Sequence, residues 1–226
     1  MIHFVGAGPG AADLITMRGH QLLTQADVII YAGSLVNPEL LQYAKESCSI
    51  YNSASMTLEE VIDVMKQAEE KNQLTVRLHT GDPCLYGAIR EQMDQLDAYN
   101  ITYDVVPGVS SFCGAAAALK AEYTLPNVSQ SVIITRMAGR TPVPEKEEIA
   151  LLAAHQATMV IFLSTGMLEQ LSQRLLAGGY QTDTPAAIVY KATWDDEKVR
   201  HCTVATLAQT AKEHNITKTA LIIVGN

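Results

Sequence analysis

The sequence predicts an α/β protein of two domains, the first with a parallel five-stranded sheet and the second with a mixed sheet. Three observations predict this. Short runs of apolar and β-branched residues alternate with segments of helical spacing through the first half of the chain. Glycine-rich turns follow most of these runs. In the second half the strand-like runs are separated by fewer helices, so part of that sheet is expected to be antiparallel.

The N-terminal half contains strand-like runs that are followed by helical patterns. Strands are expected at residues 2–5, 28–31, 49–51, 76–78 and 103–106, and helices at residues 14–25, 38–45, 58–71 and 85–99. The third helix is the clearest, because Val61, Ile62 and Met65 follow Leu58 at helical spacing with charged residues between them. Asp13 is expected to cap the first helix. Successive βα units of this kind predict a parallel sheet covered by helices.

The rest of the chain predicts a connecting segment and a second domain. An alanine-rich helix at residues 112–120 and a linker at 123–127 lie in the connecting segment, 109–130, between the predicted domains 1–108 and 131–226. Further strands are expected at residues 131–135, 159–163, 186–190, 199–203 and 220–224, and helices at 145–154, 168–177 and 207–213. The turn-like residues 194–197 join two of these strands directly, which favours an antiparallel pair.

Composition narrows the class of protein. The 226 residues are 48% hydrophobic and 18% charged, and no apolar run approaches the roughly 20 residues that span a bilayer. The chain opens on a strand-like run, so we expect a cytoplasmic protein with no membrane partner. A net charge of −8 opposes an extended nucleic-acid surface. The scattered cysteines and histidines predict neither a disulfide framework nor a protein-bound metal.

Three glycine-containing turns follow predicted parallel strands. They are residues 6–10, 80–83 and 107–111. The carboxyl ends of parallel strands form one edge of an open α/β sheet, and ligands usually bind at that edge. A single glycine cluster is explained by a tight structural turn. Three clusters at one edge predict a site for a compact polar ligand.

The first turn also fits the loose dinucleotide-binding pattern, through Gly6, Gly8 and Ala11. That pattern needs an acidic residue at the end of the second strand, whereas Asp27 stands at its start. Pro9 also removes a backbone donor that a pyrophosphate would use. A dinucleotide-binding protein, enzymatic or a cofactor sensor, is therefore the alternative hypothesis. Motifs for nucleotide or serine hydrolysis are absent.

Two polar residues accompany the second turn. His79 is interpreted either as lining a cleft or as a strand-end histidine with satisfied hydrogen bonds. Asp82 is interpreted either as a ligand contact or as a residue that stabilises its own turn. Both pairs of alternatives stay open at this level.

Taken together and in order, the three turns resemble the tetrapyrrole methylase family, and the resemblance covers essentially the whole chain. It is carried by residues 5–16, by Gly81-Asp82-Pro83, and by residues 106–111 with the helix that follows. The resemblance implies two α/β domains of the tetrapyrrole methylase type with S-adenosylmethionine folded in an interdomain cleft. It also implies S-adenosylhomocysteine as product, a tetrapyrrole or corrinoid substrate and a homodimer.

Within that family, four further stretches resemble the members that methylate C-11 of cobalt-precorrin-4 to give cobalt-precorrin-5A in anaerobic cobalamin synthesis. They are residues 31–38, 135–144, 190–194 and 218–226. Gly33-Ser34-Leu35 replaces the Asp-Arg-Leu segment that is usual in uroporphyrinogen methylase, which disfavours that earlier step. The cobalt-free precorrin-4 reaction is kept as an alternative.

The resemblance also carries site residues to this chain. The expected cofactor contacts are Pro9, Gly81, Asp82, Tyr86, Ser110, Ser111, Leu163 and Ala220. Because the macrocycle bears many carboxylates, Arg and Lys are expected around it. The expected substrate contacts are Ser34, Arg77, Arg136, Arg140 and Lys191. Arg136 and Arg140 flank residues 137–144, a loop long enough to act as a lid.

The reaction class explains why the sequence offers no catalytic triad. Methyl transfer from a sulfonium is an in-line displacement that depends mainly on alignment of the reacting atoms. The leaving group departs neutral, so neither an oxyanion hole nor a metal is required. The group that accepts the proton from the ring is not assigned.

Overall fold

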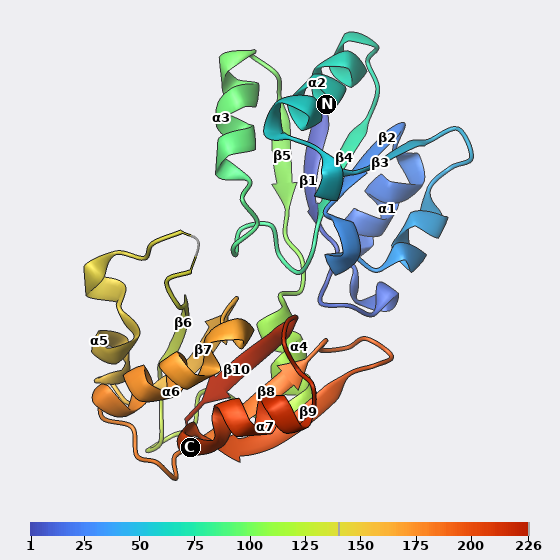
Figure 1. Ribbon diagram of the computed structural model, residues 1–226. Coiled ribbons are helices and arrows are strands. Elements are labelled where there is room, and N and C mark those ends of the chain that lie inside the picture. Colours follow the sequence, from blue (N-terminus) through green and yellow to red (C-terminus); the bar gives the residue numbers. More distant parts are fainter. Residues whose placement is uncertain (140, 226) are drawn as a thin grey trace. The chain divides into compact units, whose positions relative to one another are not determined.

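The computed structural model describes residues 1–139 and 141–225. The chain divides into two compact units, Met1–Cys113 and Gly114–Asn226, and each contains one five-stranded sheet (Figure 1). The first sheet is parallel throughout and the second is mixed. The predicted fold class of two α/β domains is thereby confirmed.

The N-terminal sheet has the strand order β3-β2-β4-β1-β5. Its strands are β1 (Ile2–Gly6), β2 (Val28–Tyr31), β3 (Ser49–Asn52), β4 (Thr75–His79) and β5 (Tyr103–Val106). The weak strand-like run near residue 50 is the edge strand β3, and all four of its residues are exposed. β4 is the central strand, with β2 and β1 on either side of it.

Helices cover both faces of this sheet. They are α1 (Met17–Gln25), α2 (Leu58–Glu70) and α3 (Arg90–Ala98). Successive residues of a strand point to opposite faces, so Ile2 and Phe4 of β1 pack in the cluster formed with α2 and α3, while Val5 packs in the cluster formed with α1. A buried apolar cluster therefore lies on each face of the sheet.

The predicted helix boundaries need correction in the N-terminal unit. Thr16, not Asp13, caps α1, and its hydroxyl accepts a hydrogen bond from the Gly19 amide. The helix expected from residue 85 begins only at Arg90, because residues 82–89 form an irregular loop. The helix expected over 38–45 is a 3₁₀ helix instead. The 3₁₀ helices of the chain are Ala12–Leu14, Gly33–Leu35, Pro38–Tyr43, Ser53–Ser55, Glu145–Glu147, Thr165–Met167 and Val204–Thr206.

The C-terminal sheet has the order β6-β7-β10-β8-β9. Its strands are β6 (Val132–Arg136), β7 (Thr158–Phe162), β8 (Pro185–Tyr190), β9 (Lys198–Thr203) and β10 (Ala220–Val224). β6 and β7 are parallel, whereas β10 is antiparallel to β7 and β8, and β9 is antiparallel to β8. The antiparallel pair expected across residues 194–197 is confirmed.

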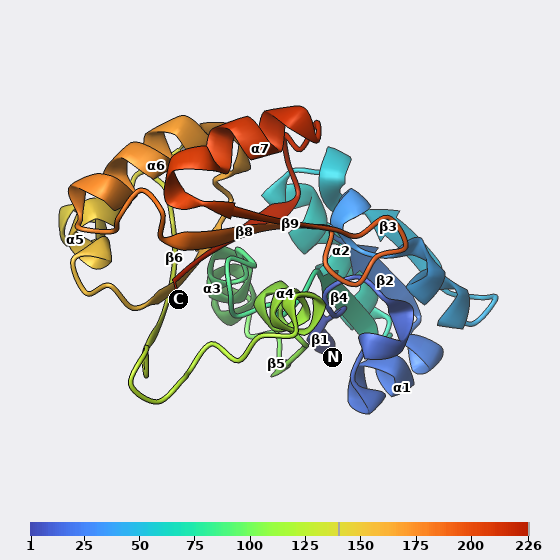
Figure 2. The ribbon, with the colours of Figure 1, turned by 90° about the horizontal axis from the view of Figure 1, so that it is seen from below.

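Three helices pack on one face of the C-terminal sheet. They are α5 (Ile149–Ala153), α6 (Leu168–Ala177) and α7 (Leu207–Glu213), and Figure 2 shows them on the same side of the strands. The helix expected over 145–154 is split into a 3₁₀ turn and the short α5. α4 (Ser111–Leu119) spans the boundary of the two units. No helix of the described ranges is long and apolar enough to cross a membrane.

Candidate active site

The three glycine turns of the N-terminal unit meet at one edge of its sheet. They follow β1, β4 and β5, which are neighbours in the sheet. The Gly8 amide donates to the Gly81 carbonyl over 3.3 Å, and the Gly81 amide donates to the Gly8 carbonyl over 2.7 Å. The Ala7 amide also donates to the His79 carbonyl over 2.7 Å. The predicted convergence of these turns is confirmed.

Two of these glycines are required by close backbone contact rather than by their φ angles. A Cβ on Gly108 would lie 2.2 Å from the Gly81 carbonyl oxygen and 2.7 Å from Gly6 Cα. A Cβ on Gly6 would lie 2.5 Å from Gly108 Cα. The backbones of the three turns therefore pack directly on one another, and no other residue type fits at either position.

Asp82 links two of the turns through its carboxylate. Oδ1 accepts a hydrogen bond from the Cys84 amide over 2.7 Å, and Oδ2 accepts one from the Gly108 amide over 2.9 Å. The first bond stabilises the turn after β4 and the second joins that turn to the turn after β5. Of the two interpretations that the sequence left open, the turn-stabilising one is observed, and a ligand contact stays a prediction.

The other predicted cofactor residues of this unit lie around the same edge. Pro9 and Ser110 are buried, and Ser111 is the half-buried first residue of α4. Tyr86 lies in the loop after Asp82, is 42% exposed and has a φ of +57°. A positive φ at a non-glycine residue is strained, and such strain clusters at functional sites. The structure therefore brings these residues to one edge of the sheet.

Arg77 was predicted to bind substrate carboxylates, but its surroundings favour a structural role. It is 6% exposed within the sheet core. Its Nε donates to Gln92 Oε1 over 2.9 Å, and an Nη donates to the Ile30 carbonyl over 3.2 Å. Burial lowers the pKa of this guanidinium to about 10. Arg77 therefore lies beneath the site, and Gln92, its partner, was not among the predicted residues.

His79 is buried at the end of β4, on the same face of the strand as Arg77. It is 4% exposed, and its Nε2 has no hydrogen-bond partner in the described part of the chain. Its ring centroid lies 6.1 Å from that of Phe4. Burial, with a smaller contribution from the Arg77 charge, lowers the pKa of His79 to about 3. It is a neutral core histidine, although the predicted hydrogen-bond satisfaction is missing at Nε2.

In the C-terminal unit the predicted residues collect at one edge of the second sheet. Arg136 ends β6, Leu163 follows β7, Lys191 follows β8 and Ala220 begins the antiparallel β10. The Lys191 amide donates to the Thr219 carbonyl over 3.0 Å. Four non-glycine residues near this edge have a positive φ. They are Leu163 (+53°), Lys191 (+46°), Thr193 (+69°) and Thr219 (+56°).

Leu163 combines two unusual properties at this edge. It is strained and its side chain is 67% exposed, although it follows a buried strand. The neighbouring Ser164, which was not predicted, is fully buried. Its hydroxyl donates to the Phe162 carbonyl over 2.6 Å and accepts from the Met137 amide over 2.9 Å. Ser164 thus fixes the turn that presents Leu163, and no sequence pattern marks it.

Arg136 binds the backbone of its own loop. Its guanidinium donates to the carbonyls of Met137, Thr141 and Pro142 over 3.1, 3.2 and 2.9 Å. These bonds hold the segment that was predicted as a lid. Arg140 lies outside the described residues.

Lys191 is the other predicted cation of this edge. Its Nζ lies 2.7 Å from Asp196 Oδ2 and 5.5 Å from the ring centroids of Tyr190 and Trp194. The carboxylate raises the pKa of Lys191. Ser34, in the N-terminal unit, is an exposed residue of the 3₁₀ helix Gly33–Leu35.

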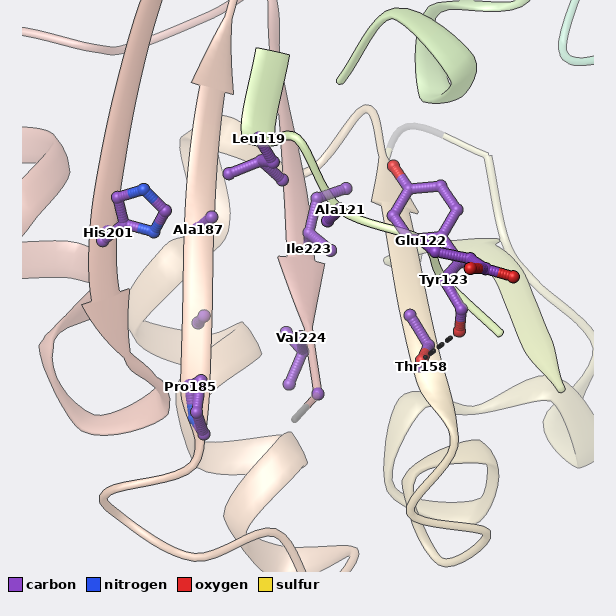
Figure 3. Close-up of a pocket in the computed structure, with 12 residues that line it drawn as sticks. Leu119, Ala121, Glu122, Tyr123, Thr158, Pro185, Ala187, His201, Ile223 and Val224 are labelled. Carbon is purple, nitrogen blue, oxygen red and sulfur yellow. Dashed lines mark hydrogen bonds between the residues drawn. The ribbon is translucent and has the colours of Figure 1, made fainter. Parts of the chain in front are cut away.

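A pocket on the C-terminal sheet lies away from this edge (Figure 3). It is lined at one end by Thr158, Pro185 and Val224, which belong to the opposite ends of β7, β8 and β10. Figure 3 shows Glu122 and Tyr123 at its side, and the Thr158 hydroxyl donates to the Tyr123 carbonyl over 2.9 Å. None of the predicted site residues lines it. Within residues 1–139 and 141–225, no group of three or more His, Cys, Asp or Glu residues could hold a metal ion.

Comparisons with known proteins agree with this arrangement. Residues 1–208 match the family described as Tetrapyrrole (Corrin/Porphyrin) Methylases. A cobalt-precorrin-4 C(11)-methyltransferase of Methanocaldococcus jannaschii is 56% identical over 98% of this chain and 85% of that protein. A precorrin-4 C(11)-methyltransferase of Mycobacterium tuberculosis is 43% identical over 100% of this chain and 90% of that protein. The X-ray structure of a cobalt precorrin-4 methyltransferase matches with a TM-score of 0.97 and 44% identity, over 99% of this chain and 94% of that one.

Proposed function

The chain belongs to the tetrapyrrole (corrin/porphyrin) methylase family, and from this premise we propose that it methylates C-11 of cobalt-precorrin-4 in cobalamin biosynthesis. The observation that carries the proposal is the 56% identity, over nearly the whole chain, with a cobalt-precorrin-4 C(11)-methyltransferase. The two sheet edges support it, since each gathers residues that the family resemblance assigns to the site.

S-adenosylmethionine is the methyl donor in this proposal, and it supplies a methyl group on a sulfonium that leaves as a neutral thioether. In the N-terminal unit, Pro9, Gly81, Asp82, Tyr86, Ser110 and Ser111 would hold it. The glycine turns support this proposal, because their close backbone packing brings residues of three turns to one edge of the sheet, where ligands of open α/β sheets usually bind. In the C-terminal unit, the exposed side chain of Leu163 and the start of β10 at Ala220 would contribute.

The role of the protein in this chemistry is alignment and exclusion of water. An in-line displacement accelerates when donor and acceptor carbon are held in line, so rigid turns matter more than an acid or base. The hydrogen bonds of Asp82 and the Gly8–Gly81 pair supply that rigidity.

The substrate is a macrocycle with many carboxylates, and cations of the C-terminal edge would bind it. Lys191 and Arg136 are the proposed contacts, together with Arg140 and, from the N-terminal unit, Ser34. Lys191 and Arg136 now bind groups of their own unit, so a substrate carboxylate would replace or extend these bonds. Arg77 is left out of this set because it is buried.

The first alternative is methylation of cobalt-free precorrin-4, which the 43% identity with the mycobacterial relative supports. The dinucleotide hypothesis loses support at the first turn. The Gly8 amide is already bonded to the Gly81 carbonyl and Pro9 has no amide hydrogen, so two donors that a pyrophosphate would use are missing.

The deciding experiment is incubation of the purified protein with S-adenosylmethionine and either cobalt-precorrin-4 or precorrin-4. Mass spectrometry is expected to show one added methyl group on the cobalt-containing substrate. Methylation of precorrin-4 alone would move the assignment to the cobalt-free reaction. In parallel, calorimetry is expected to show binding of S-adenosylhomocysteine and none of NAD, and the reverse result would contradict the proposal.

The proposal includes a homodimer in the cytoplasm. Family resemblance supports the dimer. The four cysteines are free in the structure, as is usual in a reducing compartment.

A further inference from the structure

The loop at residues 82–89 has a strained path that needs support. Tyr86 and Ala88 have φ angles of +57° and +50°, and a Cβ on Gly87 would lie 2.1 Å from the Pro83 carbonyl oxygen. The loop follows β4 at the edge where the glycine turns meet. Its first half is held by Asp82, as described above. Its second half carries Tyr86 and ends at α3.

A buried chain of hydrogen bonds reaches the second half of this loop. Gln92, 5% exposed on the first turn of α3, donates from Nε2 to the Ala88 carbonyl over 3.0 Å. Its Oε1 accepts from Arg77 Nε over 2.9 Å, and Arg77 also donates to the Ile30 carbonyl over 3.2 Å. Three bonds in series thus join β2, β4, α3 and the strained loop. They run beside the apolar cluster that contains Ile30 and Ile89.

The residue type at position 77 indicates that this series of hydrogen bonds serves a purpose other than packing. Burial alone lowers the pKa of Arg77, and no carboxylate contributes to it. A buried guanidinium without an acid is costly, and an apolar side chain would fill a strand core at lower cost. The carboxamide of Gln92 can both accept and donate, and both capacities are used: Oε1 accepts from Arg77 and Nε2 donates to the loop.

We propose that Arg77 and Gln92 are positioning residues that hold the loop 82–89 in its strained path, so that Asp82 and Tyr86 are presented to the methyl donor. The inference rests on the proposed function, because it takes Asp82 and Tyr86 as cofactor contacts. Arg77 and Gln92 are both buried, so in this proposal neither of them touches the ligand. They act by fixing the Ala88 carbonyl and with it the end of the loop.

Gln92→Glu separates this role from simple packing. The new carboxylate keeps the size of the side chain and still accepts a hydrogen bond from Arg77, with which it forms an ion pair. It places a second oxygen against the Ala88 carbonyl, where the amide had donated. The bond to the loop is therefore lost and replaced by repulsion between two oxygens, while the new ion pair with Arg77 offsets the cost to the fold. Thermal stability is therefore expected to stay close to that of the wild type. The dissociation constant for S-adenosylhomocysteine, measured by calorimetry, is expected to rise about tenfold.

The loop also contains its own reporter. Cys84 is exposed, and its pKa is raised by burial and then by Asp82. When the loop loosens, the thiol moves away from Asp82, and its alkylation by iodoacetamide is expected to become about fivefold faster. Peptide mass spectrometry over a series of pH values measures this rate. Cys113, which is also exposed, serves as the internal standard. This readout needs no ligand, so it tests the role of the Arg77–Gln92 hydrogen bonds by itself. If the wild type binds no S-adenosylhomocysteine, that result contradicts the proposed function and not the role of these bonds.

The matched control is Gln95→Glu, the same change at an exposed position of the same helix. It is expected to leave both readouts at wild-type values. Ala88→Gly in the Gln92→Glu protein is expected to restore part of the affinity, since glycine adopts a positive φ without strain. Gln92→Met, which removes both bonds without adding charge, replaces Gln92→Glu should that variant not fold. Unchanged affinity and unchanged Cys84 reactivity in the Gln92 variant would overturn the proposal.

Discussion

At the scale of single residues, the three glycine turns pack so closely that there is no space for a methyl group at Gly108. Gly108→Ala would place its Cβ 2.2 Å from the Gly81 carbonyl oxygen, so the turns must separate. We expect the free energy of unfolding to fall by about 1–3 kcal/mol in urea titrations. The affinity for S-adenosylhomocysteine is expected to fall by at least about tenfold.

Gly166→Ala is the control for this substitution, because a Cβ at Gly166 meets nothing within 4 Å. It should leave stability within about 0.5 kcal/mol and leave affinity unchanged. A Gly108→Ala protein with wild-type affinity would show that the turns can separate without harm to the site.

His79 predicts how stability depends on pH. Its pKa is lowered from 6.5 to about 3 in the fold, so between these values the unfolded chain binds the proton that the folded chain excludes. The stability from neutral His79 is complete above pH 6.5 and is lost as the pH falls toward 3. The slope from this group reaches about 1.4 kcal/mol per pH unit.

Urea titrations at several pH values between 7.5 and 4.5 measure this slope. His79→Gln cannot titrate and is expected to flatten it, whatever its stability at pH 7.5. His155→Gln, at an exposed histidine, is expected to leave it as in the wild type. Equal slopes in the wild type and the His79→Gln protein would contradict the buried neutral state.

The residues of the site differ in how far sequence alone predicts them. Gly6, Gly81 and Gly108 follow strands and belong to recognisable motifs, so the sequence predicted where they lie. It did not predict that the backbones of their turns pack on one another. The buried setting of Arg77 could not be predicted, because its partner Gln92 stands fifteen positions later and on another element. Ser164 is similar, since its partner Met137 belongs to a different strand end. Tertiary hydrogen bonds of this kind leave no local pattern.

At the scale of elements, the loop after β6 depends on one side chain. The carbonyls of Met137, Thr141 and Pro142 accept hydrogen bonds from Arg136. Arg136→Ala removes them, and we expect the KM for cobalt-precorrin-4 to rise about tenfold while the dissociation constant for S-adenosylhomocysteine changes less than about twofold. Steady-state kinetics and calorimetry measure the two quantities.

Lys146→Ala, at an exposed cation of the following 3₁₀ turn, is the control and is expected to change neither quantity. An equal loss of substrate use and cofactor affinity in the Arg136→Ala protein would mean that the loop supports the whole site rather than the macrocycle.

Strands were predicted better than helix starts, for a physical reason. Buried strands are short runs of β-branched residues, and all ten expected strands lie on the observed ones. α3 begins five residues later than predicted, because Tyr86 and Ala88 adopt positive φ angles that their residue types do not predict. Asp82 and Gln92 hold this path, and each is also bonded to a distant segment, Asp82 to the Gly108 amide and Gln92 to Arg77.

At the scale of the whole molecule, the proposed homodimer has a direct consequence for stability. Sedimentation equilibrium is expected to give twice the 24.5 kDa chain mass. If folding and association are linked, Tm will rise when the protein concentration is raised a hundredfold at a fixed scan rate. A single-chain mass and a Tm independent of concentration would contradict the dimer.

The bonds that join the three glycine turns also set the order in which the protein can become active. Gly8 pairs with Gly81, and Asp82 needs the Gly108 amide, so the edge requires segments that are far apart in the chain. Contacts of such long range form late in folding. A nascent chain that ends before Gly108 lacks the last of these donors, whatever strands it has already paired. Binding of the methyl donor therefore reports that the N-terminal unit is completely folded. The ability to bind is acquired in one step, when the last of these contacts forms.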